Sequence, residues 1–145
     1  MRHRGFSLVE LIVTILVLGI LAVVVLPRLG GNDFDALKFY DESLAAVRYA
    51  QKVAVAQNTQ VFVISTPTSL SVCYAAGCGT RVLDPSKNAP FIVTPGSAGI
   101  GLQSPPATFS FNGLGKPSAG PVTFSFLGAP ARSFTVEAET GYVHP

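Results

Sequence analysis

Few side chains in this 145-residue chain have the types and spacings that catalysis or metal binding would need. There are two histidines, His3 and His144, and two cysteines, Cys73 and Cys78. A Ser-His-Asp or Cys-His device needs a histidine held in a formed pocket by a third group, and the last residues of a chain rarely provide one. These four residues also lack the spacing of a zinc site. We therefore predict a protein that is not an enzyme and has no catalytic residue, metal or cofactor.

Two acidic residues near the end of the chain form a weaker candidate site. Glu137 and Glu139 alternate along a predicted strand, so their side chains would share one face. A carboxylate pair can act in acid–base catalysis. The alternative is a solvated face, which is typical of exposed acidic residues at the end of a strand. We favour the solvated face.

The charge of the chain argues against nucleic acid as a partner. The formal net charge is +2, but Arg2 and Arg4 lie in the first five residues, which leaves eight basic against eight acidic residues in the rest. A DNA-binding surface needs clustered cations, because phosphate contacts supply most of the nonspecific affinity. The C-terminal third instead places Lys116 and Arg132 against two glutamates.

The N-terminal segment is typical of a membrane anchor. A basic start is followed by Phe6 and, after Glu10, by the uncharged run Leu11–Leu26. As a helix, residues 6–26 would be about 31 Å long, which matches a hydrocarbon core of ~30 Å. The run ends at Pro27 without the small residues of a signal-peptide cleavage site, so we expect it to be retained. The positive-inside rule then predicts a single-pass inner-membrane protein with a cytoplasmic N-terminus and a periplasmic C-terminal part.

This location bears on the two cysteines. Cys73 and Cys78 are five residues apart in a chain with an export signal, and an oxidising compartment favours a disulfide between such residues. The intervening Gly77 could supply a positive φ for the turn. The alternative is a pair of free buried thiols.

One acidic residue does not fit a simple anchor. Glu10 lies within the apolar span, where a carboxylate costs a few kcal/mol unless it is paired. It lies near one end of the span, so its side chain could also reach the membrane surface and have no further role.

The residues around Glu10 point to a role in assembly. The stretch Gly5-Phe6-Ser7-Leu8-Val9-Glu10-Leu11 closely resembles the signature of type IV prepilins and type II secretion pseudopilins. The resemblance implies cleavage between Gly5 and Phe6 by a prepilin peptidase, methylation of the Phe6 amine, and a role for Glu10 in subunit registration. Pro27 corresponds to the proline that kinks the helix in this family. The implied partners are major and minor pilins, the inner-membrane assembly platform and the lipid bilayer.

A second helix follows the apolar span. Asp33 can cap a helix over residues 34–57, and its apolar or small residues recur at spacings of three and four. The predicted core face consists of Leu37, Tyr40, Leu44, Val47, Ala50 and Ala54. We read this helix as a stem onto which a sheet packs. The predicted division of the chain is a leader peptide (1–5), a transmembrane assembly helix (6–27), a stem (28–57) and a periplasmic β domain (58–145).

The hydrophobic period changes to two beyond residue 60. Five segments read as strands, namely 60–65, 69–73, 108–111, 122–126 and 133–137. Phenylalanine alternates with serine or threonine in several of them, as in an antiparallel sheet with one buried face. The predicted fold class is therefore α+β, with a long N-terminal helix packed on an antiparallel sheet. Residues 84–106, with short apolar pieces among prolines and glycines, give no clear pattern.

Two short stretches suggest a particular branch of the family. Residues 48–57, which begin Arg48-Tyr49-Ala50-Gln51, resemble the stem of GspH/FimT-like minor pilins. The ending Glu139-Thr140-Gly141-Tyr142-Val143-His144 resembles the MshC-type minor pilins of the MSHA (mannose-sensitive haemagglutinin) pilus. The implied function is to initiate or cap a type IV pilus. The alternatives are a minor pseudopilin of a type II secretion system and, less favoured by the charges, a minor pilin for DNA uptake.

Overall fold

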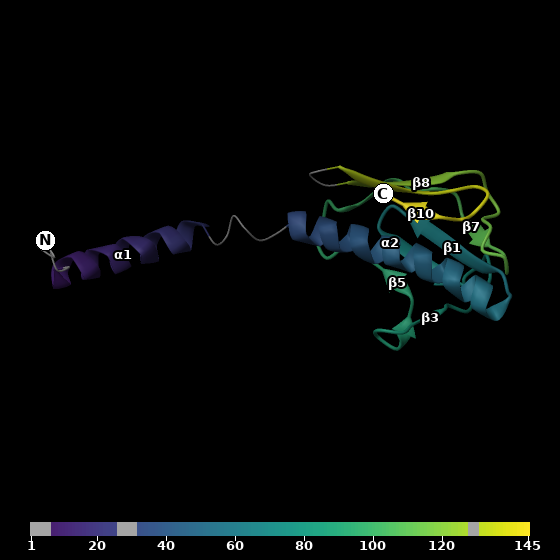
Figure 1. The fold of residues 1–145 in the computed structure, drawn as a ribbon, viewed down its shortest axis with the longest axis horizontal. Coiled ribbons are helices and arrows are strands. Elements are labelled where there is room, and N and C mark those ends of the chain that lie inside the picture. Colours follow the sequence, from purple (N-terminus) through teal and green to yellow (C-terminus); the bar gives the residue numbers. More distant parts are fainter. Residues whose placement is uncertain (1–6, 26–31, 128–130) are drawn as a thin grey trace, which may run out of the picture. The chain divides into compact units, whose positions relative to one another are not determined.

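The computed structural model describes residues 7–25, 32–127 and 131–145 of the chain. These residues belong to two compact units, residues 1–31 and residues 32–145, which are drawn in Figure 1 and described separately below.

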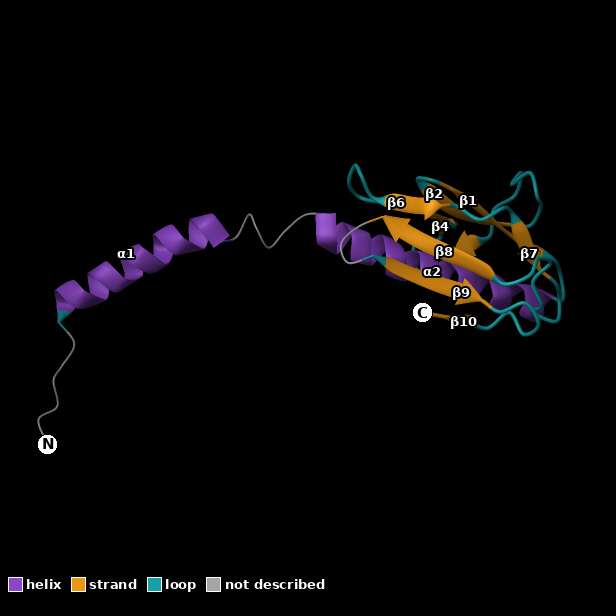
Figure 2. Ribbon diagram, turned by 90° about the horizontal axis from the view of Figure 1, so that it is seen from above, coloured by secondary structure: helices purple, strands orange, loops and turns teal. Residues whose placement is uncertain are grey.

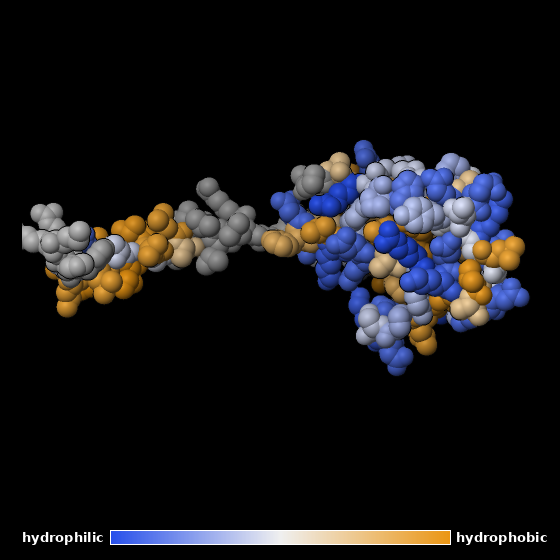
Figure 3. Space-filling model, viewed as in Figure 1, coloured by the Kyte–Doolittle hydropathy of each residue, from blue (hydrophilic) through white to orange (hydrophobic). Residues whose placement is uncertain are grey.

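The described residues of the first unit form one helix, α1 (Leu8–Val25). Leucine, isoleucine and valine dominate its sequence, and its surface is largely hydrophobic in Figure 3. A helix that is apolar on all sides requires an apolar environment around it. Phe6, Leu26 and Pro27, which the predicted anchor includes, lie outside the described residues. Among the residues described, no helix combines the length and the apolar character needed to cross a membrane.

The second unit begins with the stem helix, α2 (Asn32–Gln57). It starts at Asn32, so Asp33 lies in the first turn of the helix and is not the residue before it, as predicted. The helix ends where Asn58 adopts a positive φ of 47° and the N–H of Thr59 donates to the carbonyl of Ala54 (3.0 Å). Such a left-handed residue is a common way to satisfy the last carbonyls of a helix.

The face of α2 that packs on the sheets is wider than predicted. Tyr40, Val47, Ala50 and Ala54 are buried as expected, whereas Leu37 and Leu44 are only partly buried. The buried face also includes Phe39, Ser43, Ala46 and Val53. The face widens because α2 packs against strands of two sheets.

The strands form two four-stranded sheets and a two-stranded ribbon, all antiparallel (Figure 2). The first sheet has the order β5-β2-β1-β7, and the second has the order β10-β9-β8-β6. The bounds are β1 (Val61–Thr66), β2 (Ser69–Cys73), β3 (Leu83–Asp84), β4 (Ala89–Pro90), β5 (Ile92–Val93), β6 (Gly101–Ser104), β7 (Phe109–Phe111), β8 (Val122–Leu127), β9 (Arg132–Val136) and β10 (Val143–His144). The predicted α+β class is confirmed.

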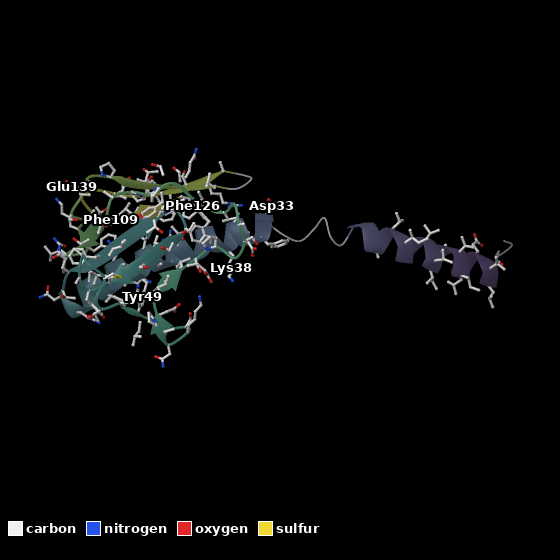
Figure 4. All side chains as sticks on the ribbon, turned by 180° about the vertical axis from the view of Figure 1, so that it is seen from behind. Asp33, Lys38, Tyr49, Phe109, Phe126 and Glu139 are labelled. Atoms are coloured by element: carbon white, nitrogen blue, oxygen red, sulfur yellow. A yellow bond between two sulfur atoms is a disulfide. The ribbon has the colours of Figure 1, made fainter. Side chains whose placement is uncertain are left out.

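Aromatic side chains from both sheets and from α2 fill the core. Phe124 of β8 stacks on Phe134 of β9, with ring centroids 4.7 Å apart. Phe126 meets Phe39 of α2 edge to face at 5.5 Å, and Phe109 of the first sheet meets Phe124 of the second at 6.2 Å. Figure 4 labels Phe109 and Phe126 within this unit. Helix and sheets therefore share one core, which holds α2 in a fixed position against the strands.

Candidate functional site

The predicted assembly residue Glu10 lies in the first turn of α1, where its side chain is exposed. One turn further on, the hydroxyl of Thr14 donates to the carbonyl of Leu11 (2.8 Å), so this polar group is satisfied within the helix. Glu10 is the one charged residue between Ser7 and Val25. In an apolar environment an unpaired carboxylate at this position would cost a few kcal/mol. The cleavage and methylation residues Gly5 and Phe6, and the kink residue Pro27, lie outside the described residues.

A second feature joins the C-terminal half of α2 to the end of the chain; we call it the C-terminal clamp. Arg48 donates from Nη2 to the carbonyl of Val143 (2.9 Å). Gln51 donates from Nε2 to the carbonyls of Gly115 and Thr140, each at 3.0 Å. Two side chains of one helix thus hold the last strand and the loop that follows β7.

Two glycines allow the backbones in the clamp to approach closely. Gly115 has a φ of 80° and Gly141 has a φ of 67°. Residues other than glycine rarely adopt such positive φ angles. A Cβ added to Gly141 would collide with the carbonyl oxygen of Gly115. The stretches beginning at Arg48 and at Glu139, which separately resemble minor pilins, are therefore in direct contact. Sequence reasoning missed this contact, although it had singled out both stretches.

Glu137 and Glu139 do not form the carboxylate pair that was the less favoured alternative. β9 ends at Val136, and the chain then turns where the N–H of Gly141 donates to the carbonyl of Glu137 (2.9 Å). Glu137 pairs with His144 at 2.8 Å, and Glu139 pairs with Lys116 at 2.7 Å. The side-chain alternation that would have aligned the two carboxylates ends with the strand at Val136. Both glutamates are solvated and paired, as the favoured alternative expects.

The His144–Glu137 pair fastens β10 to the end of β9. The hydrogen bond that the His144 ring donates to the Glu137 carboxylate, with a smaller effect from the carbonyl of Pro145, raises the pKa of His144 above its ordinary value of 6.5. Protonated His144 is thus favoured in the folded state, and stabilisation is fully present below pH 6.5. It is lost as the pH rises through the raised pKa.

Comparison with Glu137→Gln tests this linkage. The melting temperature of the wild type should exceed that of Glu137→Gln most at mildly acidic pH, and the gap should close as the solution becomes alkaline. Thermal unfolding followed by circular dichroism over this range measures the gap. A gap that stays constant with pH would show that the histidine does not titrate in this pair.

The disulfide predicted between Cys73 and Cys78 is confirmed, with Cα atoms 5.1 Å apart. The loop differs from the prediction in one respect: Cys78 itself has the positive φ, 53°, and Gly77 does not. Cys73 lies opposite Arg81, beyond Cys78 in the chain. The N–H of Cys78 donates to the carbonyl of Ala75 (2.9 Å), which closes a tight turn.

Breaking this disulfide should weaken the domain without unfolding it. Closing so short a loop stabilises by about 2 kcal/mol on the chain-entropy estimate. We expect Cys78→Ser to lower the free energy of unfolding by about this amount. Cys73→Ser should cost more, because Cys73 is fully buried and the change also buries a hydroxyl. Denaturant unfolding measures both, and equal stability of wild type and Cys78→Ser would contradict the expectation.

Among the described residues, no group of three or more histidine, cysteine, aspartate or glutamate side chains gathers as metal ligands would. The polar groups of the clamp bind backbone carbonyls of the same chain. The C-terminal clamp thus holds the end of the chain and the loop after β7 against α2.

Comparison with known proteins adds two findings. Residues 1–26 match the family described as "Prokaryotic N-terminal methylation motif". The chain is also similar to two crystal structures of the type IV minor pilin FimU of Pseudomonas aeruginosa. The first has a TM-score of 0.59 at 15% identity and covers 75% of this chain and 86% of FimU. The second has a TM-score of 0.53 at 16% identity and covers 74% of this chain and 90% of the FimU chain.

The motif and the fold both support the pilin family. At these identities the likeness to FimU establishes the fold alone. The methylation motif implies processing by a prepilin peptidase and other pilins as partners in general, and it suggests a membrane-anchored, pilus-associated protein. No curated protein matches this chain at a significant level.

Proposed function

We propose that this chain is a minor pilin of the MSHA type that initiates or caps a type IV pilus. In this proposal, prepilin peptidase cleaves between Gly5 and Phe6, and the new Phe6 amine is methylated. Residues 6–27 anchor the subunit in the inner membrane, and residues 28–57 form the stem of a periplasmic domain. The role is structural and not enzymatic.

The observation that carries the proposal is the combination of a prepilin-type N-terminus with a pilin fold in the same chain. Neither feature alone would suffice, because the motif covers only residues 1–26 and the fold likeness rests on low identity. FimU is described as a minor pilin, and we extend that description to this chain. The MSHA branch is supported by the resemblance of the stretch ending at His144, which the clamp places against the stem.

Glu10 has a defined part in the proposal. An amine at Phe6 would lie one helical turn from Glu10, about 6 Å along the axis. The pair between Glu10 of an incoming subunit and the Phe6 amine of the last subunit added would set the axial position of the new subunit. A charge pair in an apolar interior is strongly favoured over an unpaired carboxylate, so it selects one register.

Deletion of the gene tests whether the chain serves a type IV pilus or a type II secretion system. In the bacterium that encodes this chain, deletion should lower the number of surface pili severalfold and leave type II secretion unchanged, and a plasmid copy should restore the pili. Quantitative mass spectrometry of sheared pili should find the chain as a small fraction of the total pilin. Loss of secretion with normal pili would replace the proposal by a minor pseudopilin, and a dominant share of the pilus would exclude a minor role.

A further inference from the structure

The first turn of α2 carries an exposed aromatic side chain. Phe34 is 67% exposed, whereas every other phenylalanine that the structure describes is buried or partly buried. Phenylalanine is among the residues most often found inside proteins. The exposed ring at the start of α2 therefore indicates a contact outside this unit.

A second exposed apolar side chain lies at the same end of the unit. β8 ends near the first turns of α2, where the ring of its Phe126 meets the rings of Phe39 and Tyr40 at 5.5 and 5.3 Å. Figure 2 shows this end of β8 beside the start of α2. Leu127, the next residue of the strand, is 43% exposed. We call Phe34 and Leu127 together the apolar rim.

The charges beside the apolar rim cancel. Lys38 is exposed in the second turn of α2, and Arg132 is exposed at the start of β9, opposite the end of β8. Asp33 is exposed, and the carboxylate of Asp35 accepts a hydrogen bond from the hydroxyl of Ser97. With two bases and two acids, this end of the unit creates no strong field of either sign. Its partner must therefore offer an apolar layer next to charges of both signs.

The chain itself keeps the apolar rim close to such a layer. In the proposed function the anchor ends at Pro27, and α2 begins at Asn32. Five residues of fully extended chain span at most about 18 Å, so the start of α2 stays near the lipid surface. The headgroup region on each side of the hydrocarbon core is roughly 5–8 Å thick. Phospholipid, with charged headgroups over an apolar layer, is thus a partner that the rim can reach.

We propose that Phe34 and Leu127 insert into the lipid interface of the membrane that holds the anchor, and so dock the periplasmic unit on its phospholipid surface. This inference rests on the proposed function, because it requires residues 6–27 to span that membrane. Phenylalanine and leucine are typical of protein surfaces that lie in this interface. Because the neighbouring charges cancel, the contact is apolar and does not depend on anionic lipid. The contact orients the subunit before assembly and is broken when the subunit leaves the membrane.

Single-tryptophan variants of the full-length protein test the contact, because the chain contains no tryptophan. Phe34→Trp, Leu127→Trp and Leu114→Trp are each reconstituted in phosphatidylcholine vesicles, with and without a lipid that carries a nitroxide near the top of its acyl chain. Fluorescence at positions 34 and 127 should fall about twofold with the nitroxide lipid, because insertion by about 5–10 Å brings both rings to its depth.

Leu114 provides the matched control. It is 88% exposed, more than either member of the apolar rim. It lies between Gly113 and Gly115, which approach Asn58 and Val55 at the end of α2. That end is about 32 Å from Phe34 along the helix axis. Fluorescence of Leu114→Trp should therefore be the same with and without the nitroxide lipid.

Position 127 separates docking from simple tethering. Phe34 follows the anchor so closely that the chain alone brings it near lipid, whereas Leu127 belongs to another segment and reaches the surface only in the docked orientation. Phe34→Ser in the Leu127→Trp variant should therefore remove most of the quenching, and Phe34→Leu should retain it. Quenching at position 34 alone, equal quenching at 34, 114 and 127, or quenching at 127 that survives Phe34→Ser would each overturn the proposal. Loss of the quenching at high salt would also overturn it, because an apolar contact is not screened.

Alkaline extraction of the same vesicles separates this inference from the proposed function. A protein that resists extraction but shows no quenching at position 127 keeps its anchor, and only the docking is overturned. A protein that alkali releases lacks the anchor, and both proposals fail. The expected quenching in a chain that is absent from sheared pili would support the docking and refute the pilus function.

Discussion

Glu10→Gln should leave membrane insertion, cleavage after Gly5 and folding of the periplasmic unit intact, and should lower incorporation into filaments roughly ten- to a hundredfold. Hydrogen bonds to charged groups contribute about 1.5–3 kcal/mol, and each 1.4 kcal/mol is about a factor of ten in an equilibrium. Glutamine keeps the shape of the side chain but loses the charge that the Phe6 amine of the neighbouring subunit would meet. Incorporation is measured as the share of the chain in sheared filaments relative to membranes.

Thr14→Val is the matched control for this variant. Thr14 lies one turn beyond Glu10 on the same helix, and its hydroxyl is satisfied by the carbonyl of Leu11. Removing that hydroxyl should leave incorporation unchanged. If Glu10→Gln also assembles like the wild type, Glu10 only reaches the membrane surface and has no role in registration.

Gly141→Ala should be the most damaging single-methyl change in the C-terminal clamp, costing about 3 kcal/mol or more of folding free energy. Two causes combine. A left-handed backbone costs a residue with a side chain about 1–2 kcal/mol. The new Cβ would also collide with the carbonyl of Gly115 and lie 2.6 Å from Nε2 of Gln51, so the backbone of the clamp must move. A fall in melting temperature of the order of 10 °C is expected for residues 32–145.

Two other glycines separate these causes. Gly99 has a φ of 85° with open space around it, so Gly99→Ala should show the backbone cost alone. Gly120 has neither a positive φ nor a close neighbour, and Gly120→Ala should be nearly neutral. We expect Gly141→Ala to destabilise the domain most, Gly99→Ala less, and Gly120→Ala least. A Gly141→Ala variant no less stable than Gly99→Ala would mean that the clamp adapts without strain.

The longer elements could be predicted from the sequence because their patterns are local. The α2 helix was predicted from residue 34 and observed from Asn32, with the same end at Gln57. All five predicted strands are present to within one residue at each end, as β1, β2, β7, β8 and β9. Alternating apolar side chains in strands of three to six residues are enough to locate these strands in the sequence.

The remaining strands depend on pairing between distant segments. β3, β4, β5 and β10 are two residues long, too short for a period to be visible. β5 exists because Val93 pairs with Leu70, and β6 because Leu102 pairs with Phe126. The division into two sheets follows from such pairings and is invisible in the local pattern.

The functional residues divide in the same way. The motif around Glu10 is contiguous, so it could be recognised from the sequence alone. The clamp joins Arg48 and Gln51 to carbonyls 64 to 95 residues away, and backbone carbonyls have no sequence signature. Glu137 and Glu139 form no carboxylate pair, as the favoured prediction expected, because the turn at Gly141 ends the strand that would have aligned the two side chains.

Mass spectrometry of the mature N-terminus in sheared surface filaments tests the central proposal most directly. Filaments from the bacterium that encodes this chain should contain it as a minor component whose first residue is Phe6, with a methylated amine and without residues 1–5. The same peptide from cells that lack prepilin peptidase should retain the leader. A chain in filaments that begins at any other residue, or a processed chain that is absent from all filaments, would contradict the account.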